Sequence, residues 1–116
     1  SLGPSAWDGG LAPQLVAPGE VVRSAWIGGP DKYDEKSGTS TASPQLAGVV
    51  ALLWSKFPQL IGEVDRTREI LFKSARPTTS NQSCPGFPGQ VIPNAVYGYG
   101  MLDAHATLKT ATAILK

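Results

Sequence analysis

The sequence contains few of the residues from which many enzyme sites are built. Among its 116 residues there is one cysteine, Cys84, and one histidine, His105. A single cysteine cannot form a disulfide within the chain, so it gives no information about the redox compartment. No basic residue and no expected helix start lies beside Cys84 to activate its thiol. We therefore interpret Cys84 as a bystander rather than a nucleophile.

A strong net charge and a long apolar run are also lacking. The formal net charge is +1, which gives no reason to expect nucleic acid or an anionic membrane as a partner. No apolar run is long enough to span a membrane, and the first residues do not form a signal-peptide pattern. The length suits one small domain with a modest core. Thirteen glycines and ten prolines indicate many turns, as in a loop-rich α/β enzyme.

Hydrophobic patterns and turn residues predict a mixed α/β order along the chain. The expected elements are a short strand at 14–17, a strand at 21–27, and helices at about 41–56, at about 63–75 and after Asp103. The charged residues 31–37 are expected in a solvated hairpin or loop, and 77–96 in an irregular stretch. The triplet Asn81-Gln82-Ser83 matches the glycosylation acceptor pattern, which often arises by chance.

The helix expected at 41–56 is apolar on nearly every side. Leu46, Val49, Leu52 and Leu53 are spread around it, so it needs cover on all faces. A chain of this length cannot supply that cover well. We expect the helix to pack against another polypeptide.

Ser40 lies where this helix is expected to begin, directly after Gly38-Thr39. A helix start offers unpaired backbone N–H groups and a positive dipole end, which favour developing negative charge. A hydroxyl nucleophile needs such a place, exposed and next to donors for an oxyanion. Serine is also a common helix cap. Local chemistry alone leaves both roles open.

The run Gly38-Thr39-Ser40-Thr41-Ala42-Ser43-Pro44 resembles the active-site serine motif Gly-Thr-Ser-x-Ala-x-Pro of subtilisin-like serine peptidases, the subtilases. Residues 1–19, from Ser1-Leu2-Gly3-Pro4 to Ala17-Pro18-Gly19, resemble the family segment that ends in Ala-Pro-Gly. Residues 97–104 resemble the tyrosine-glycine turn before the last helix. The resemblance implies that Ser40 is the nucleophile and that its own backbone N–H is an oxyanion donor. Gln45 departs from the pattern, since most members carry a histidine there.

The resemblance implies that residues 1–116 are the C-terminal segment of a longer catalytic domain. The intact fold would be an α/β three-layer sandwich with a mostly parallel sheet. In subtilases the catalytic aspartate and histidine and the oxyanion asparagine precede the serine, and none of their motifs occurs before Ser40. We expect the chain alone to be inactive. Its partner would be a complementary N-terminal protease chain or a second copy.

The expected function is peptide-bond hydrolysis by a serine endopeptidase, through an acyl-enzyme on Ser40. The alternative is a non-catalytic interaction module or pseudoprotease in which Ser40 only caps the helix. His105 beside Asp103 is not expected to be the base, because its place in the terminal helix matches no catalytic element of the family. We expect no cofactor or metal site in this chain, although structural calcium can belong to the intact fold. The resemblance favours a secreted or extracytoplasmic protein.

Overall fold

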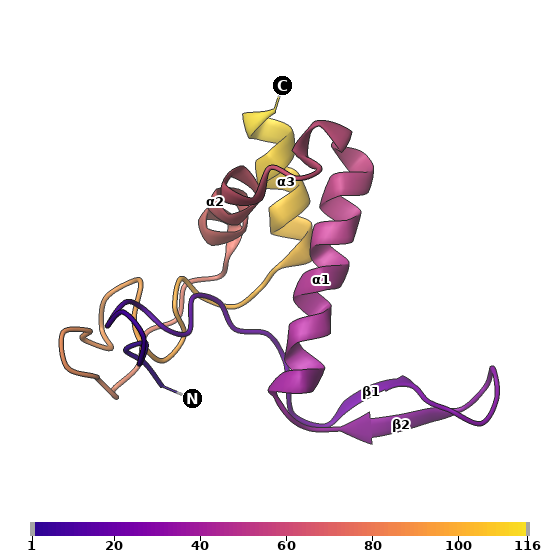
Figure 1. Ribbon diagram of the computed structural model, residues 1–116, viewed down its shortest axis with the longest axis horizontal. Coiled ribbons are helices and arrows are strands. Elements are labelled where there is room, and N and C mark those ends of the chain that lie inside the picture. The colour runs from indigo at the N-terminus through magenta and orange to yellow at the C-terminus, as the bar shows by residue number, and fades with distance from the viewer. Residues whose placement is uncertain (1, 116) are drawn as a thin grey trace.

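The structure is a computed structural model that describes residues 2–115. Ser1, which opens the upstream motif, and Lys116, which ends the expected segment, lie outside the described residues. The elements in chain order are β1 (Val22–Ala25), β2 (Tyr33–Lys36), α1 (Thr39–Lys56), the 3₁₀ turn η1 (Pro58–Leu60), α2 (Val64–Ser74) and α3 (Ala104–Ile114). Figure 1 shows α2 and α3 beside one end of α1, with the hairpin projecting from the other end.

The hairpin confirms two expectations from the sequence. β1 lies within the predicted strand 21–27, and β2 lies within the charged segment 31–37 that was expected in a solvated hairpin or loop. The strands pair antiparallel, from Val22 opposite Lys36 to Ala25 opposite Tyr33. At the turn, Gly28 and Gly29 have φ values of 110° and 149°. Side-chain-bearing residues rarely adopt such values, so the two glycines permit the reversal.

The hydrophobic core lies where the three helices meet. Its fully buried members come from all three helices and η1, and they are Leu53, Leu60, Ile70 and Ala111. Trp54 packs at its edge and donates a hydrogen bond from Nε1 to Thr67 Oγ1 on α2 at 3.0 Å. The three predicted helices are therefore confirmed.

The chain itself covers only one side of α1. Val49 and Leu53 are buried, whereas Ala47, Gly48, Ala51 and Leu52 are exposed. Leu52 is 55% exposed. Apolar area that stays exposed contributes no burial free energy within this segment. Ala47, Gly48, Ala51 and Leu52 form one apolar face of α1 that no residue among 2–115 covers. We call them the outer face of α1.

The short strand expected at 14–17 forms only a single parallel bridge, between Val16 and Met101. Val16 N–H donates to Gly100 O at 3.1 Å, and Leu102 N–H donates to Val16 O at 2.8 Å. A strand needs a neighbour bonded along its length, and among residues 2–115 this segment has only that one parallel partner. The mostly parallel sheet of the expected intact fold is therefore not formed within the part of the chain described here.

The stretch 77–96 is irregular, as the sequence predicts, and Asn94 organises its base. Asn94 is completely buried. Its Nδ2 donates to Thr78 O at 2.9 Å and to Val91 O at 3.1 Å. Its Oδ1 accepts from the backbone N–H groups of Val96 and Tyr97. One side chain thus satisfies four backbone groups in a loop without regular structure.

Candidate active site

Ser40 lies exposed in the first turn of α1 and does not cap it. The N-cap is Gly38, one residue before the helix begins at Thr39, and no side chain makes a capping hydrogen bond. Thr41 and Ala42 donate their N–H groups to Gly38 O at 3.0 and 3.3 Å. The N–H groups of Thr39 and Ser40 donate to no acceptor within residues 2–115. The cap role considered for Ser40 is therefore wrong, because a helix capped by Ser40 would begin at Thr41, two residues later than α1 does.

Gly38 sets this geometry through its backbone conformation. Its φ is 143°, in a region that L side chains rarely adopt. The chain can therefore enter the helix abruptly, and Ser40 is placed on the first turn rather than before it. A helix start with free N–H groups favours an anion, and the Ser40 N–H is one such donor.

The Ala17-Pro18-Gly19 segment packs directly against the turn that carries Ser40. Gly38 N–H donates to Gly19 O at 2.6 Å, and Val21 N–H donates to Ser37 Oγ at 2.8 Å. A Cβ on Gly19 would lie 2.9 Å from Gly38 O. Only glycine fits there without a shift, so the two motifs are in close backbone contact.

The same upstream segment also contacts the tyrosine-glycine turn. Tyr99 N–H donates to Gln14 O at 2.9 Å, and a Cβ on Gly98 would collide with the Gln14 carbonyl group. Tyr99 stacks on Phe72 of α2 with ring centroids 4.3 Å apart. Residues 14–19 therefore join the serine motif to the tyrosine-glycine turn, although the three motifs are far apart in the sequence.

Ser40 borders a hollow of about 480 Å³ between the start of α1 and the hairpin. The hollow is lined by both strands and the first helical turns, and its lining includes Trp26, Asp34, Lys36, Ser40, Pro44 and Gln45. The nucleophile candidate thus borders an open space. His105 and Asp103 do not line it.

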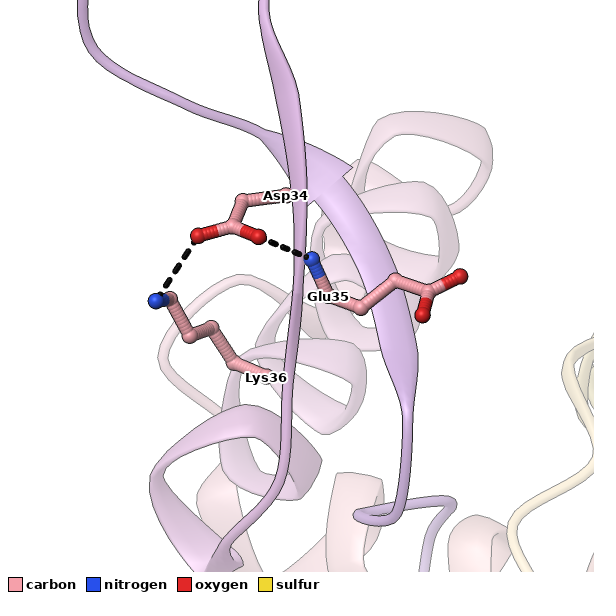
Figure 2. Close-up of polar contacts among 3 residues, drawn as sticks. All are labelled: Asp34, Glu35 and Lys36. Carbon is pink, nitrogen blue, oxygen red and sulfur yellow. Dashed lines mark hydrogen bonds and ion pairs between the residues drawn. The ribbon is translucent and has the colours of Figure 1, made fainter.

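Two of the three charged residues that line this hollow, Asp34 and Lys36, are paired with one another, whereas the guanidinium group of Arg23 lies 4.6 Å from the centre of the Tyr33 ring. Lys36 Nζ lies 2.8 Å from Asp34 Oδ2 and 4.5 Å from the centre of the Trp26 ring. The Lys36 ammonium, and then the Glu35 N–H, hold the pKa of the Asp34 carboxyl below its usual value. Figure 2 shows the Asp34 carboxylate between these two donors, with the Glu35 side chain pointing away. An ionised carboxylate already occupied in this way offers no base to Ser40.

The side chain of Gln45 makes a hydrogen bond to Pro18 that was not predicted from the sequence. Its side-chain amide donates from Nε2 to Pro18 O at 2.6 Å and to Thr41 O at 3.3 Å. The sequence indicated only that Gln45 departs from the family pattern. A signal was present, since Gln45 follows Thr41 by four residues and so shares its side of the helix.

His105 is exposed in the first turn of α3. Asp103, its neighbour in the sequence, accepts from Ala106 N–H at 2.9 Å and so acts as the N-cap of α3. The expected start of the last helix after Asp103 is confirmed.

The other residues that the sequence singled out, Cys84 and Asn81, do not line the hollow beside Ser40. Cys84 is half-buried in a turn closed by Cys84 and Phe87. Asn81 is exposed, and its Oδ1 accepts from Gln90 Nε2 at 3.0 Å. Residues 2–115 contain no group of three or more His, Cys, Asp or Glu side chains that could hold a metal ion. Within the same residues, no helix has the length and hydrophobicity needed to cross a membrane.

Comparisons with known proteins agree on one family. The sequence pattern described as "Subtilase family" matches residues 1–100. Bacillopeptidase F of Bacillus subtilis (strain 168) is 34% identical over 110 residues, which are 95% of this chain and 7% of that protein. Subtilisin-like protease 2 of Trichophyton verrucosum is 46% identical over 52 residues, 45% of this chain and 12% of that protein.

Two solved structures resemble this one. The Clostridium perfringens CspB protease superposes with a TM-score of 0.70 at 30% identity, over 93% of this chain and 22% of that chain. The patellamide maturation protease PatA gives a TM-score of 0.58 at 27% identity, over 85% of this chain and 34% of that chain. The chain therefore spans a small part of the length of each protein it resembles.

Proposed function

The chain belongs to the subtilase family, and from this premise we propose that Ser40 is the nucleophile of a subtilisin-type serine endopeptidase. The family supports a hydrolase of the serine protease kind. The expected fold class, part of a subtilisin-like α/β fold, is confirmed by the likeness to the CspB and PatA proteases. The assignment to peptide bonds within chains, and to Ser40, is our proposal.

One observation carries the proposal. Ser40 is exposed on the first turn of α1, borders a hollow and takes no part in capping the helix. A serine with a purely local role would be expected to accept a hydrogen bond from the N–H groups of the first turn. This one leaves its own N–H free, which suits the developing negative charge of an attacked carbonyl oxygen.

The proposed reaction follows from these groups. The Ser40 hydroxyl oxygen attacks the peptide carbonyl carbon, and its proton passes to a histidine base. The Ser40 N–H stabilises the oxyanion, the amine leaves with the proton, and water hydrolyses the acyl-enzyme. No base adjoins Ser40 in the hollow that residues 2–115 form. We therefore propose that this segment works only with an N-terminal portion that supplies the aspartate, the histidine and the oxyanion asparagine.

The outer face of α1 supports this partnership. Its four residues are apolar or small, they are exposed, and they lie on the same side of α1. A contiguous exposed apolar surface of this kind marks an interaction site. The proposed occupant is the N-terminal portion of the protease. A second copy of this chain is the competing outcome, and light scattering of the isolated segment would reveal it as a stable homodimer.

The test is labelling of the full protein with a fluorophosphonate that modifies activated serines. Wild type should be labelled on Ser40, and Ser40→Ala should abolish both labelling and peptide hydrolysis. Ser43→Ala is the matched control, because Ser43 is exposed in the same turn and should leave both intact. Unlabelled but folded wild-type protein would instead favour the interaction module. Labelling that persists in Ser40→Ala would refute the assignment of the nucleophile.

Two further properties belong to the proposal rather than to this segment. A structural calcium ion in the intact fold would need ligands from outside it, because residues 2–115 hold no suitable side-chain cluster. We propose secretion or another extracytoplasmic location on the basis of the family. Fractionation of the source cells with an antibody to the hairpin would test that location.

A further inference from the structure

We propose that Gln45 is a positioning residue for Ser40, which it serves by fastening the first turns of α1 to the Pro18–Gly19 turn. The inference rests on the proposed function, because it concerns the aim of the same hydroxyl. Gln45 Nε2 donates to Pro18 O at 2.6 Å across 27 positions of sequence and to Thr41 O at 3.3 Å. One amide therefore links the turn before the hairpin to the helix that carries the serine.

The orientation of the amide is fixed by its partners. Both contacts are carbonyl oxygens, which can only accept hydrogen bonds. The NH₂ end of Gln45 must therefore face Pro18 and Thr41, and no other assignment of the amide satisfies both contacts. The side chain is half-buried and lines the same hollow as Ser40. Its chemistry, two donors on one nitrogen, matches the two acceptors that it meets.

The start of α1 needs such a fastening because Pro44 weakens it. Proline has no N–H, so the carbonyl group of Ser40 lacks the bond that the fourth following residue normally gives. The backbone bonds of this first turn converge instead on Gly38 O, from Thr41 and Ala42. Because the backbone hydrogen bond to Ser40 O is missing, contacts with neighbouring segments contribute more to the stability of the first turn of α1.

Three hydrogen bonds join residues 18–21 to the start of α1 and the turn before it. The bond from Gln45 is the one that lies furthest along the helix. The other two are Gly38 N–H to Gly19 O at 2.6 Å and Val21 N–H to Ser37 Oγ at 2.8 Å, both before Ser40 in the sequence. Among residues 2–115, the side chain of Gln45 makes the hydrogen bond to the Pro18–Gly19 turn from the side after Ser40. Without the hydrogen bond from Gln45 to Pro18 O, the first turn of α1 can rotate about the other two bonds. The Ser40 hydroxyl then leaves its catalytic position.

The test compares Gln45→Glu with the matched control Gln59→Glu in the full protein. Gln45→Glu keeps the shape but replaces the two donors with a carboxylate facing two carbonyl oxygens. Gln59 is exposed, and its side chain makes no hydrogen bond within residues 2–115, so the same change of charge there should be silent. Because a displacement of about 1 Å can cost about a hundredfold in rate, we expect kcat and fluorophosphonate labelling of Ser40 to fall about tenfold to a hundredfold. KM should stay within about twofold, since the amide donors of Gln45 are engaged by Pro18 O and Thr41 O rather than by substrate.

Two additional readouts separate positioning from a general loss of structure. Lowering the pH protonates the new carboxyl group, which can then donate to Pro18 O, so the ratio of variant to wild-type labelling should rise. Gln45→His keeps an N–H donor and should recover most of the rate. These relative measures remain valid if Gln45→Glu also lowers the melting temperature.

The outcomes distinguish this inference from the proposed function. Labelled wild type with less than about a fivefold loss in Gln45→Glu would overturn the positioning role and leave Ser40 as nucleophile. An equal loss in Gln59→Glu, a pH-independent ratio, or no recovery in Gln45→His would overturn it as well. Absence of labelling in the folded wild type would instead refute the proposed function.

Discussion

Two adjacent leucines of α1 provide a direct test of whether its outer face is covered in the full protein. Leu53 is completely buried in the core of this segment, whereas its neighbour Leu52 is 55% exposed. Truncation of a buried leucine to alanine costs about 2–5 kcal/mol, through lost transfer free energy and the cavity left behind. Substitution of an exposed side chain usually changes stability by less than about 0.5 kcal/mol. Leu53→Ala should therefore destabilise α1 in any context.

Leu52→Ala should destabilise α1 only if another part of the protein packs on the outer face. We expect it to do so in the full protein, with a loss of about 2–5 kcal/mol like that of Leu53→Ala. The assay is hydrogen exchange of the amides of α1, which reports the local free energy of opening rather than unfolding of the whole molecule. A loss of 2 kcal/mol corresponds to about thirtyfold faster exchange, since about 1.4 kcal/mol is a factor of ten.

The opposite result would show that the outer face of α1 is not covered. If Leu52→Ala changes exchange in α1 by less than about twofold while Leu53→Ala accelerates it by about thirtyfold or more, the outer face is open to solvent in the full protein. The proposed N-terminal partner would then lack its docking surface on this helix. Leu53→Ala serves as the internal control that the assay detects a lost core contact.

Three further predictions concern the loop, the last helix and the histidine. Asn94→Ala should lower the free energy of unfolding by about 3 kcal/mol or more, because up to four buried backbone groups lose their partner at about 1 kcal/mol or more each; a loss below 1 kcal/mol by urea unfolding would contradict this. Asp103→Ala should cost about 0.5–2 kcal/mol through loss of the cap on Ala106 N–H, and Asp103→Asn should restore most of it. His105→Ala should leave kcat within a few-fold and preserve the basic limb of the pH–rate profile, and loss of that limb would make His105 the base.

The elements of this fold were predictable wherever a local signal marks both ends. α1 begins after Gly38 and stops at Phe57, just before Pro58. α3 begins after Asp103, whose side chain accepts a hydrogen bond from the Ala106 N–H. These residues act on their immediate neighbours, so their effect can be predicted without knowledge of the rest of the chain. The predicted boundaries of the helices accordingly lie within two residues of the observed ones.

Features that depend on distant residues were not predictable in the same way. The hydrogen bond from Gln45 to Pro18 joins positions 27 residues apart, and nothing in either local pattern specifies the other. The strand expected at 14–17 is apolar enough, yet it forms only a bridge because pairing depends on a neighbour. The cap role of Ser40 was left open by the sequence and is decided by the φ of Gly38. Local chemistry restricts such features but does not choose among them.

If Ser40 is the nucleophile, two tasks fall to different parts of the protein: holding the Ser40 hydroxyl in place and accepting its proton. The groups that aim Ser40 lie within this segment, since Gly19, Gly38 and Gln45 all contact the turn that carries it. The group that must accept its proton does not adjoin it in the hollow formed by residues 2–115. A serine can be aimed by contacts within its own segment, whereas attack at neutral pH needs a base. Substitutions in this turn should therefore act on kcat, while substitutions in α2 and α3 should act on stability. The nucleophile would then be fully positioned before the catalytic base is brought to it.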